Sequence, residues 1–359
     1  MRTYYWMTLV GKINKLILKL LLTTFLLCFL SSCFKQTPEK QITFNGRTMG
    51  TTYSIKLYPA NSDLDQEQLH IKIEQVLSTV DRTMSTYKNK SDISLFNQLK
   101  STQWITFPAD LINVIREAQH ISLLTNGAFD ITVGALVDLW GFGKITQTEK
   151  IPESKDINRL LKTLGYKNIN IHPTANQISK KHPDISIDLS AIAKGYGVDK
   201  VAEALDKEGI HNYLVEIGGE IRVRGFKNET SPWILAIEKP STKMRSVHQK
   251  LVLSNQGMAT SGNYRNYFEK EGERYSHIIN PKTGRPITHS TASVSVIHVS
   301  CMTADAWATG LLAMGYEKGY QLAEQKGLAV YFIYRKGDQF INLATTGFKK
   351  YLNKKQENK

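Results

Sequence analysis

Segment 185–200 constrains the fold more than any other part of the chain, because the hydrophobic period changes within it. Apolar and polar residues alternate over its first five positions, which is the period of a half-buried strand. Between Lys194 and Leu205 the pattern recurs at helical spacing. The sequence therefore predicts a strand that turns into a helix, with Ser190 at the junction as a candidate helix cap.

The same segment has the features of an anion-binding cradle. Gly195 and Gly197 each weaken a helix by roughly 1 kcal/mol relative to alanine, so they suggest that something approaches the backbone closely. Asp188 ends the predicted strand, and Lys194 lies near a helix N-terminus with its partial positive charge. Together these groups suit a diphosphate or a metal-bound phosphate. The alternative is an ordinary joint with a solvated aspartate and lysine.

Residues 1–33 have the layout of a secretory signal, because four basic residues and no acidic ones precede an apolar run and then small residues. The sequence 30–33 looks like a bacterial lipobox, in which Cys33 becomes the lipidated first residue of the mature protein. The alternative is a membrane-spanning anchor, but Lys19 leaves too few apolar residues for a span of about 20. In both cases we expect a domain in the bacterial cell envelope, held to a membrane and facing the periplasm or the exterior.

Composition places further limits on the mature chain. The net charge of +14 falls to about +10 without the signal cations, which fits anionic headgroups or a polyanionic small ligand. No clustered basic and aromatic stretch indicates nucleic acid. Only Cys301 would remain as a free thiol, which excludes an intramolecular disulfide and a cysteine metal cage. Residues 34–41 predict a linker, 42–350 one large domain or two close-packed lobes, and 351–359 a polar tail.

The remaining pattern favours an α+β fold with mostly antiparallel sheets and flanking helices, because many hairpins are interspersed with a few long helices. A single G-x-G without a third glycine argues against a dinucleotide-binding βαβ unit. Helices are expected over 69–84, over 111–121 with a cap at Asn126-Gly127, in a short piece after Pro152, and from residue 302. Strands are expected around 42–44, 53–57, 128–133, 169–171, 177–179, 213–224, 233–238, 247–253, 263–268, 275–279 and 292–299.

Three residues before the central segment are candidates for ligand contact. Met49 stands at a turn, where it either plugs an edge of the core or packs on a flat aromatic ligand. Tyr87 follows a predicted helix and is either a core-edge tyrosine or a ring stacked on a ligand. Asp130 lies among apolar residues and would be costly to bury alone, so it needs a partner in the protein or in the ligand.

Two later stretches have residues with catalytic chemistry. His277 precedes an Asn-Pro-x-x-Gly turn and is either a surface hydrogen bonder or a base for a hydroxyl, because its ordinary pKa lies near neutrality. Asp305 and Thr309 are four residues apart on a predicted helix capped by Thr303, so they share a face. With a backbone carbonyl, a substrate phosphate and waters they would suit Mg²⁺. Alternatively, Thr309 bonds to its own helix and Asp305 supports the first turn.

The motifs, taken in order along the chain, resemble the ApbE family of flavin transferases. The resemblance runs from about residue 42 to 350 and implies an ApbE-like, T-fold-like domain. It further implies Mg²⁺-dependent transfer of the FMN half of FAD to a Thr or Ser hydroxyl of an acceptor protein, with release of AMP. The motifs are the lipobox, Arg47–Thr51, Gly127–Asp130, Asp188–Gly195, Ser276–Pro281 and Thr303–Thr309.

Carried over by position, the resemblance implies a role for each motif. His277 is similar to the base that deprotonates the accepting hydroxyl, and Asn280 departs from the family by replacing an expected aspartate. Acceptors would be subunits of membrane redox complexes, such as Na⁺-translocating NADH:quinone reductase or Rnf-type complexes. The implied metal ligands are the carbonyl of Ala191 with Asp305 and Thr309. The implied flavin-nucleotide contacts are Met49, Tyr87, Ala128, Phe129, Asp130, Asp188, Lys194 and Ile279.

Three other functions fit parts of the pattern. A metal-dependent FAD pyrophosphatase would use the same site with water in place of the acceptor. A lipoprotein that only stores flavin would have no need of a metal. A structural envelope lipoprotein would leave Gly195 and Gly197 unexplained.

Overall fold

The computed structural model describes residues 41–59, 64–144, 151–227, 231–241 and 246–352. The expected signal peptide, Cys33, the linker up to residue 40 and the tail beyond residue 352 lie outside the described residues. Within the described ranges, no helix combines the length and the apolarity that a bilayer crossing requires.

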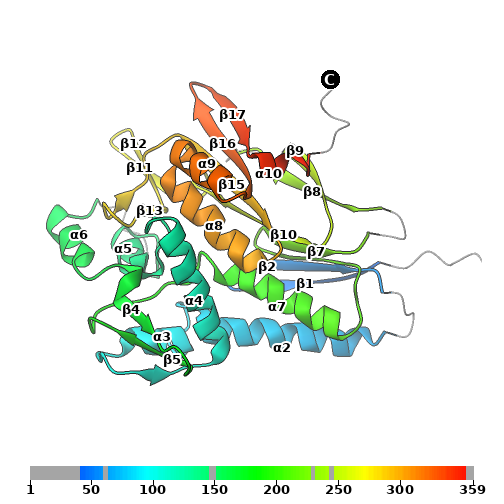
Figure 1. Ribbon diagram of the computed structural model, residues 1–359, viewed down its shortest axis with the longest axis horizontal. Coiled ribbons are helices and arrows are strands. Elements are labelled where there is room, and N and C mark those ends of the chain that lie inside the picture. The colour runs from blue at the N-terminus through cyan, green and yellow to red at the C-terminus, as the bar shows by residue number, and fades with distance from the viewer. Residues whose placement is uncertain (1–40, 60–63, 145–150, 228–230, 242–245, 353–359) are drawn as a thin grey trace, which may run out of the picture. The chain divides into compact units, whose positions relative to one another are not determined.

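An eight-stranded antiparallel sheet forms the centre of the fold, in the order β1-β2-β6-β7-β10-β15-β16-β17 (Figure 1). Strand β16 shows why the sheet is buried on both faces, since Val330 and Phe332 enter one core cluster and Tyr331 and Ile333 enter another. The α+β fold class expected from the sequence is thus confirmed. The strands are β1 (Ile42–Thr48), β2 (Thr51–Leu57), β6 (Tyr213–Ile217), β7 (Glu220–Arg224), β10 (Gln256–Gly262), β15 (Thr291–His298), β16 (Ala329–Lys336) and β17 (Gln339–Ala344).

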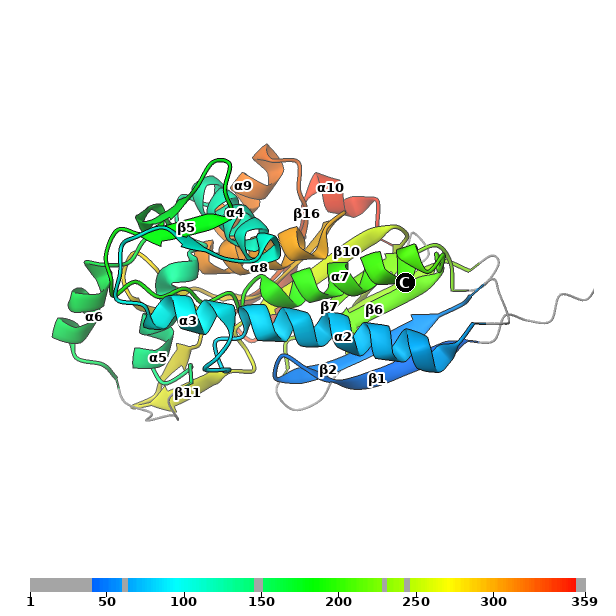
Figure 2. The ribbon, with the colours of Figure 1, turned by 90° about the horizontal axis from the view of Figure 1, so that it is seen from below.

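Helices cover one face of this sheet, and a hairpin covers part of the other. Helices α2 (Gln66–Met84), α7 (Ala193–Lys207) and α8 (Cys301–Met314) lie side by side, as Figure 2 shows. The helix patterns predicted over 69–84 and 111–121 are confirmed. On the opposite face, the β8–β9 hairpin shares a core cluster with β16. The remaining elements of these layers are α4 (Ala109–Leu124), α9 (Tyr316–Gln325), α10 (Thr346–Lys349), β8 (Trp233–Glu238) and β9 (Val247–Leu253).

Smaller elements surround the end of the helical layer, and some of them contribute residues to the site described below. A three-stranded sheet has the order β3-β5-β4, and two short hairpins pair β11 with β12 and β13 with β14. Their bounds are α3 (Asp92–Gln98), β3 (Ile105–Thr106), η1 (Ile131–Val133), α5 (Gly134–Leu139), α6 (Ser154–Leu161), η2 (Tyr166–Asn168), β4 (Ile169–Ile171), β5 (Gln177–Lys180), β11 (Tyr267–Lys270), β12 (Glu273–Ser276), β13 (Ile279–Asn280) and β14 (Arg285–Pro286).

The strand predicted over 185–189 is wrong, because this segment pairs with no strand. The side-chain amide of Asn97 takes the place of a neighbouring strand, donating to the carbonyl of Ile187 at 2.8 Å and accepting from its N–H at 2.7 Å. The N–H of Asp188 donates to the carbonyl of Ile131 at 2.8 Å. Apolar residues alternate in this segment because one side of it is buried. Its backbone groups, however, form hydrogen bonds with the Asn97 side chain and with the turn at Ile131, and not with a neighbouring strand.

The strand predicted over 128–133 is also wrong, since turn and bend residues lead into a 3-10 turn (η1) there, and helix α5 begins directly after it. The side chain of Asp130 accepts from the N–H of Thr132 at 2.9 Å and thereby caps the turn. An aspartate in an apolar run was therefore a capping signal and not an isolated charge in a strand.

Both predicted caps on the two central helices are wrong. Helix α7 begins at Ala193, and the Ser190 hydroxyl donates to Asp188 instead of capping the helix. The cap of α8 is Ser300, whose hydroxyl oxygen accepts from the N–H of Thr303 at 3.2 Å. The predicted caps are wrong because α7 begins two residues later than a cap at Ser190 requires, and α8 begins three residues earlier than a cap at Thr303 requires.

Gly195 and Gly197 are approached closely, but by the protein itself. A Cβ on Gly195 would lie 2.3 Å from the carbonyl oxygen of Cys301, and one on Gly197 would lie 2.6 Å from Cε of Met49. The glycines thus allow close packing of α7 against α8 and the β1–β2 turn. They give no argument for a ligand and none against a structural lipoprotein.

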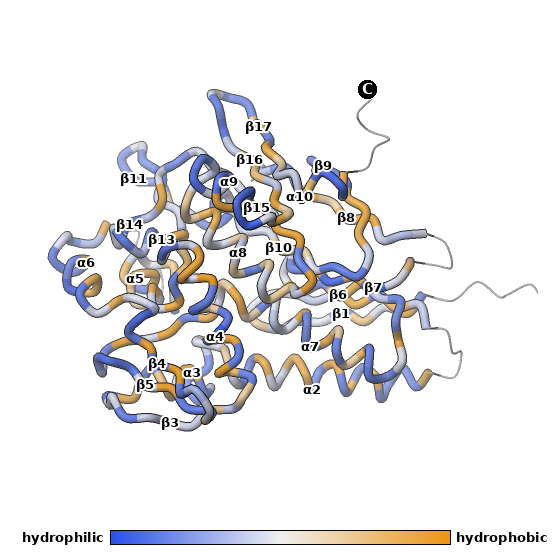
Figure 3. The backbone as a smooth tube through the Cα atoms, viewed as in Figure 1, coloured by the Kyte–Doolittle hydropathy of each residue, from blue (hydrophilic) through white to orange (hydrophobic). Residues whose placement is uncertain are grey.

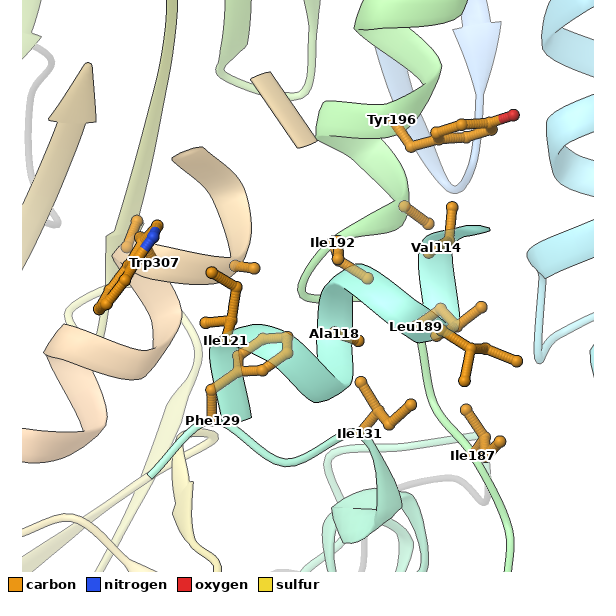
Figure 4. Close-up of a cluster of buried hydrophobic side chains, with 14 of the residues drawn as sticks. Val114, Ala118, Ile121, Phe129, Ile131, Ile187, Leu189, Ile192, Tyr196 and Trp307 are labelled. Atoms are coloured by element: carbon orange, nitrogen blue, oxygen red, sulfur yellow. The ribbon is translucent and has the colours of Figure 1, made fainter. Parts of the chain in front are cut away.

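The segment that precedes α7 is anchored in the core cluster that it shares with α4, α8 and the central sheet. In Figure 4, Leu189 and Ile192 pack with Ala118 and Val114 of α4, and Phe129 lies beside Ile121. Apolar anchors on both sides of Asp188 therefore hold this polar residue at a defined place.

Hydropathy along the backbone follows the layers of the fold. In Figure 3 the hydrophobic stretches lie within the layers, and the tip between β16 and β17 is hydrophilic.

We expect Asn97→Ala to destabilise the protein by about 1–3 kcal/mol, because two backbone groups of Ile187 lose their hydrogen-bond partner. Denaturant unfolding would measure the change in the free energy of unfolding. Asn113→Ala is the matched control, since Asn113 makes an exposed hydrogen bond with Arg116 only. Equal stability of the two variants would contradict the role given to Asn97.

Candidate active site

One cavity of about 480 Å³ brings together the predicted site residues, with the exception of Met49. Its wall combines the turn after α4, the segment before α7, strand β10, the β12–β13 connection and helix α8. The predicted residues that line it are Tyr87, Ala128, Phe129, Asp130, Asp188, Ala191, Lys194, His277, Ile279, Asp305 and Thr309.

Met49 does not line this cavity. It adopts a left-handed conformation (φ 47°) in the β1–β2 turn, and its Cε lies against Gly197 at the edge of the core. This is the core-plug alternative stated for Met49 above.

Lys194 is the central charge of the cavity. Its Nζ lies 3.3 Å from Oε1 of Glu220 and 3.9 Å from Oδ2 of Asp305, and these two carboxylate side chains are only 4% and 3% exposed. Burial lowers the pKa of Lys194, but the two carboxylates together outweigh it and raise that pKa above its usual value. The lysine is therefore a cation at neutral pH.

Glu220 also lines the cavity, although no sequence motif indicates it. Its Oε2 is buried and has no hydrogen-bond partner among the described residues. Burial raises the pKa of Glu220 to about 8, against the opposing effect of Lys194. The only sequence signal was an acid directly after Gly218-Gly219, which was assigned to a hairpin turn. Glu220 and Asp305 thus place two buried carboxyl groups around one ammonium, and their mutual repulsion contributes to the raised pKa of Glu220.

Asp305 and Thr309 both face the cavity from α8, and neither supports its own helix. Oδ2 of Asp305 accepts from the N–H of Gly195 in α7 at 3.0 Å, and the Thr309 hydroxyl lies 2.9 Å from that of Ser261 in β10. Burial raises the pKa of Asp305, while Lys194 and the N–H of Gly195 oppose the rise. The structural alternatives stated for these two residues are therefore not what the fold contains.

The oxygen donors fit Mg²⁺ by their chemistry. In the part of the chain that the structure describes, no three His, Cys, Asp or Glu side chains converge as a metal site. A metal would depend on the Asp305 carboxylate, the Thr309 hydroxyl and the carbonyl of Ala191, all hard oxygen donors at the cavity. Mg²⁺ prefers oxygen ligands and is commonly held by few protein groups plus phosphate and water.

Asp130 has its partners in the protein. Its Oδ1 accepts from the N–H and hydroxyl of Thr132 at 2.9 and 2.7 Å, and its Oδ2 accepts from the N–H of Tyr166 at 2.9 Å. Burial raises the pKa of Asp130, and these hydrogen bonds oppose the rise. Asp188 similarly accepts from the N–H of Ser190 at 2.8 Å. The hydrogen bonds fix both carboxylates at the cavity wall.

His277 is arranged as a neutral base. Its Nδ1 lies 2.9 Å from the carbonyl oxygen of Asn266, which can only accept, so Nδ1 carries the proton and Nε2 has the free lone pair. Burial lowers the pKa of His277, the Asn266 carbonyl opposes this, and the charge of Lys194 lowers it further. The imidazole therefore stays unprotonated to a lower pH than an ordinary histidine.

The cavity also contains polar residues that no motif indicated. Thr260 and Ser261 belong to β10, whose small residues have no strand period, and Asn266 orients His277 through its main chain. Main-chain contacts of this kind leave no signal in side-chain identity, so no sequence pattern indicates Asn266.

Comparison with known proteins places this architecture among flavin transferases. The family model described as the ApbE family matches residues 49–332. The chain belongs to the ApbE family. It is 44% identical over 328 residues to the FAD:protein FMN transferase of Vibrio cholerae serotype O1, covering 91% of this chain and 97% of that protein. It is 43% identical to the FAD:protein FMN transferase of Haemophilus influenzae, with 91% and 95% coverage.

Solved structures of the ApbE family agree with this fold. The flavin transferase ApbE from Vibrio cholerae superposes with a TM-score of 0.82 at 43% identity, over 88% of this chain and all of that one. The apo flavinyl transferase ApbE of Pseudomonas stutzeri gives 0.81 at 35% identity, over 89% and 99%. The family recognised from the motifs is confirmed, and the matched range contains all the predicted site residues of the cavity.

Proposed function

We propose that this protein is an enzyme that transfers FMN from FAD to a Thr or Ser hydroxyl of an acceptor protein and releases AMP. The observation that supports the proposal most is the meeting, on one cavity, of a charged lysine, a pair of oxygen donors on α8 and a neutral histidine. The names of the ApbE-family relatives support flavin transfer, and the donor chemistry supports the participation of Mg²⁺.

Lys194 would bind the diphosphate of FAD through its ammonium group. Asp305, Thr309 and the carbonyl of Ala191 would hold Mg²⁺, which when bound offsets the charge that develops on the diphosphate. Tyr87, which is 66% exposed, offers aromatic surface at the cavity wall, which suits an isoalloxazine ring. Phe129 is buried in the core behind that wall. The protein would thus hold the FMN half of the dinucleotide at its flavin ring and at its phosphate.

His277 would take the proton of the acceptor hydroxyl at Nε2. The hydroxyl oxygen then forms a bond to the phosphorus of the FMN half, and the bond from that phosphorus to the oxygen of the AMP phosphate breaks. AMP leaves with the bonding electron pair, and FMN remains as a phosphoester on the acceptor. Each proton and charge is thereby accounted for by a named group.

Two alternatives differ in testable ways. A FAD pyrophosphatase would use the same residues with water as the nucleophile, so only the acceptor separates the two activities. A protein that merely stores flavin would have no use for a deprotonated Nε2 at His277 or for oxygen donors at Asp305 and Thr309.

We further propose that the protein is a lipoprotein of the bacterial cell envelope, anchored to a membrane through Cys33 and directed outward by a cleaved signal peptide. The charge layout of residues 1–33 and the lipobox support this. Acceptors in membrane redox complexes, of the Na⁺-translocating NADH:quinone reductase or Rnf type, would then meet the enzyme at the same membrane.

Mass spectrometry of a candidate acceptor subunit tests the proposal. After incubation with FAD, Mg²⁺ and this protein, we expect the acceptor to gain the mass of one FMN on a Thr or Ser, with one AMP released per modified chain. AMP release without acceptor modification would favour the pyrophosphatase, and neither product would favour flavin storage.

A further inference from the structure

Helices α7 and α8 begin next to one another, and each is capped by an acidic side chain from the other. Asp305 of α8 accepts from the N–H of Gly195 at 3.0 Å, and α7 has no capping side chain of its own. In return, Asp199 of α7 accepts from the N–H groups of Cys301 and Met302, both at 3.0 Å. This exchange satisfies N-terminal N–H groups that would otherwise lack partners.

The carboxylate of Asp199 accepts four hydrogen bonds within the part of the chain that the structure describes. Beyond the two N–H groups of α8, it accepts from the hydroxyl of Ser300 at 2.8 Å and from the guanidinium of Arg222 in β7 at 2.6 Å. A carboxylate has about four lone-pair sites, so these hydrogen bonds leave its orientation no freedom. The side chain is 9% exposed, and little water competes for it.

The first residue of α8 also has no room to shift. A Cβ on Gly195 would lie 2.3 Å from the carbonyl oxygen of Cys301, and one on Gly257 of β10 would lie 2.9 Å from its N and Cα atoms. Cys301 is thus held between α7 and the sheet. The Asp199 hydrogen bonds to Cys301 and Met302 therefore act on a helix start that is already closely packed.

We propose that Asp199 is a positioning residue that fixes α8 against α7, so that Asp305 and Thr309 of α8 face the cavity beside Lys194 of α7. The reciprocal caps make one rigid unit of the two helices that carry the metal donors and the phosphate-binding lysine. Asp199 is not among the residues that line the cavity. The inference rests on the proposed function, because it concerns how tightly the site holds Mg²⁺.

Titration of Mg²⁺ into Asp199→Asn tests this role. Flavin fluorescence is followed with FAD present and no acceptor, well below the melting temperature. We expect the half-saturating Mg²⁺ concentration to rise by about 10-fold or more, as is typical when a residue that orients a metal ligand is changed. At saturating Mg²⁺ we expect the FMN transfer rate to recover to near that of the unaltered protein, which a merely destabilised fold would not produce.

Asp206→Asn is the matched control, because Asp206 lies two turns further along α7 and pairs with Arg224. Its Mg²⁺ requirement should not change. A folded Asp199→Asn protein with an unchanged Mg²⁺ requirement would overturn the inference and leave the proposed function intact. An unaltered protein that does not respond to Mg²⁺ would overturn both.

If Asp199→Asn does not fold, the Mg²⁺ titration of Arg222→Gln tests the same inference. It removes one charge-assisted hydrogen bond of the four and should raise the half-saturating Mg²⁺ concentration by about threefold. No change in folded Arg222→Gln would then overturn the inference.

Discussion

Replacing Asp305 by alanine is expected to lower FMN transfer by about 10³-fold or more, because it removes the only carboxylate of the proposed metal donor set (each factor of ten corresponds to about 1.4 kcal/mol of barrier). The change also leaves the N–H of Gly195 without its cap and Lys194 with Glu220 alone. Single-turnover flavinylation of an acceptor, followed by its mass, measures the loss.

Asp305→Asn separates the two roles of this side chain. Its amide oxygen can still accept from the N–H of Gly195, so the cap remains, but the charge that attracts a cation is absent. We expect transfer by Asp305→Asn to stay close to that of Asp305→Ala and stability to stay close to that of the unaltered protein. Transfer by Asp305→Ala that is retained in added Mg²⁺ would refute the ligand assignment.

His277→Ala is expected to bind FAD with unchanged affinity but to flavinylate an acceptor about 10²–10⁴-fold more slowly, the range typical for a lost general base. The reason is that Nε2 is the unprotonated nitrogen, and Nδ1 is committed to the Asn266 carbonyl. Flavin-fluorescence titration gives the affinity, and acceptor mass gives the rate. Flavinylation at the unaltered rate would remove His277 from the mechanism.

The pH profile of the unaltered protein provides an independent check. Burial lowers the pKa of His277, so the imidazole stays a base as the pH falls and becomes protonated only below its ordinary value near 6.5. The acid limb of kcat/KM should therefore have its midpoint below pH 6.5. This limb should vanish in His277→Ala, and a midpoint above 6.5 would contradict the burial of the ring.

The sequence predicted much of the fold through hydrophobic period. The amphipathic pattern of residues 69–84 gave helix α2, and alternation gave the β6–β7 hairpin with Gly218-Gly219 at its turn. The hydrophobic period predicted a strand wrongly where a side chain or a turn takes the place of a neighbouring strand. Segment 185–189 alternates like a strand, yet its partner is the amide of Asn97, some ninety positions away along the chain.

Motifs predicted the residues of the candidate site, but most of the geometry that brings them together had no signal in the sequence. Asp305 and Thr309 share a face because they are four residues apart on a helix, and this local relation was legible in advance. The contacts of Asp305 with Gly195 and of Lys194 with Glu220 join distant segments, and such pairings depend on how the layers pack. Met49 packs on Gly197 and is not among the residues that line the cavity.

The sequence by itself determined the α+β class, the family and the chemical types of the groups that meet in the cavity, because period and motif are local properties of the chain. Only the tertiary structure decided the protonation tendencies of Lys194, Glu220 and His277, which follow from burial and from neighbours distant in sequence. It also decided that Asp199 and Asp305 cap each other's helices. A hydrogen bond between two helices requires their close approach. Gly195 permits this approach, but the approach itself depends on how the helices pack in the folded protein.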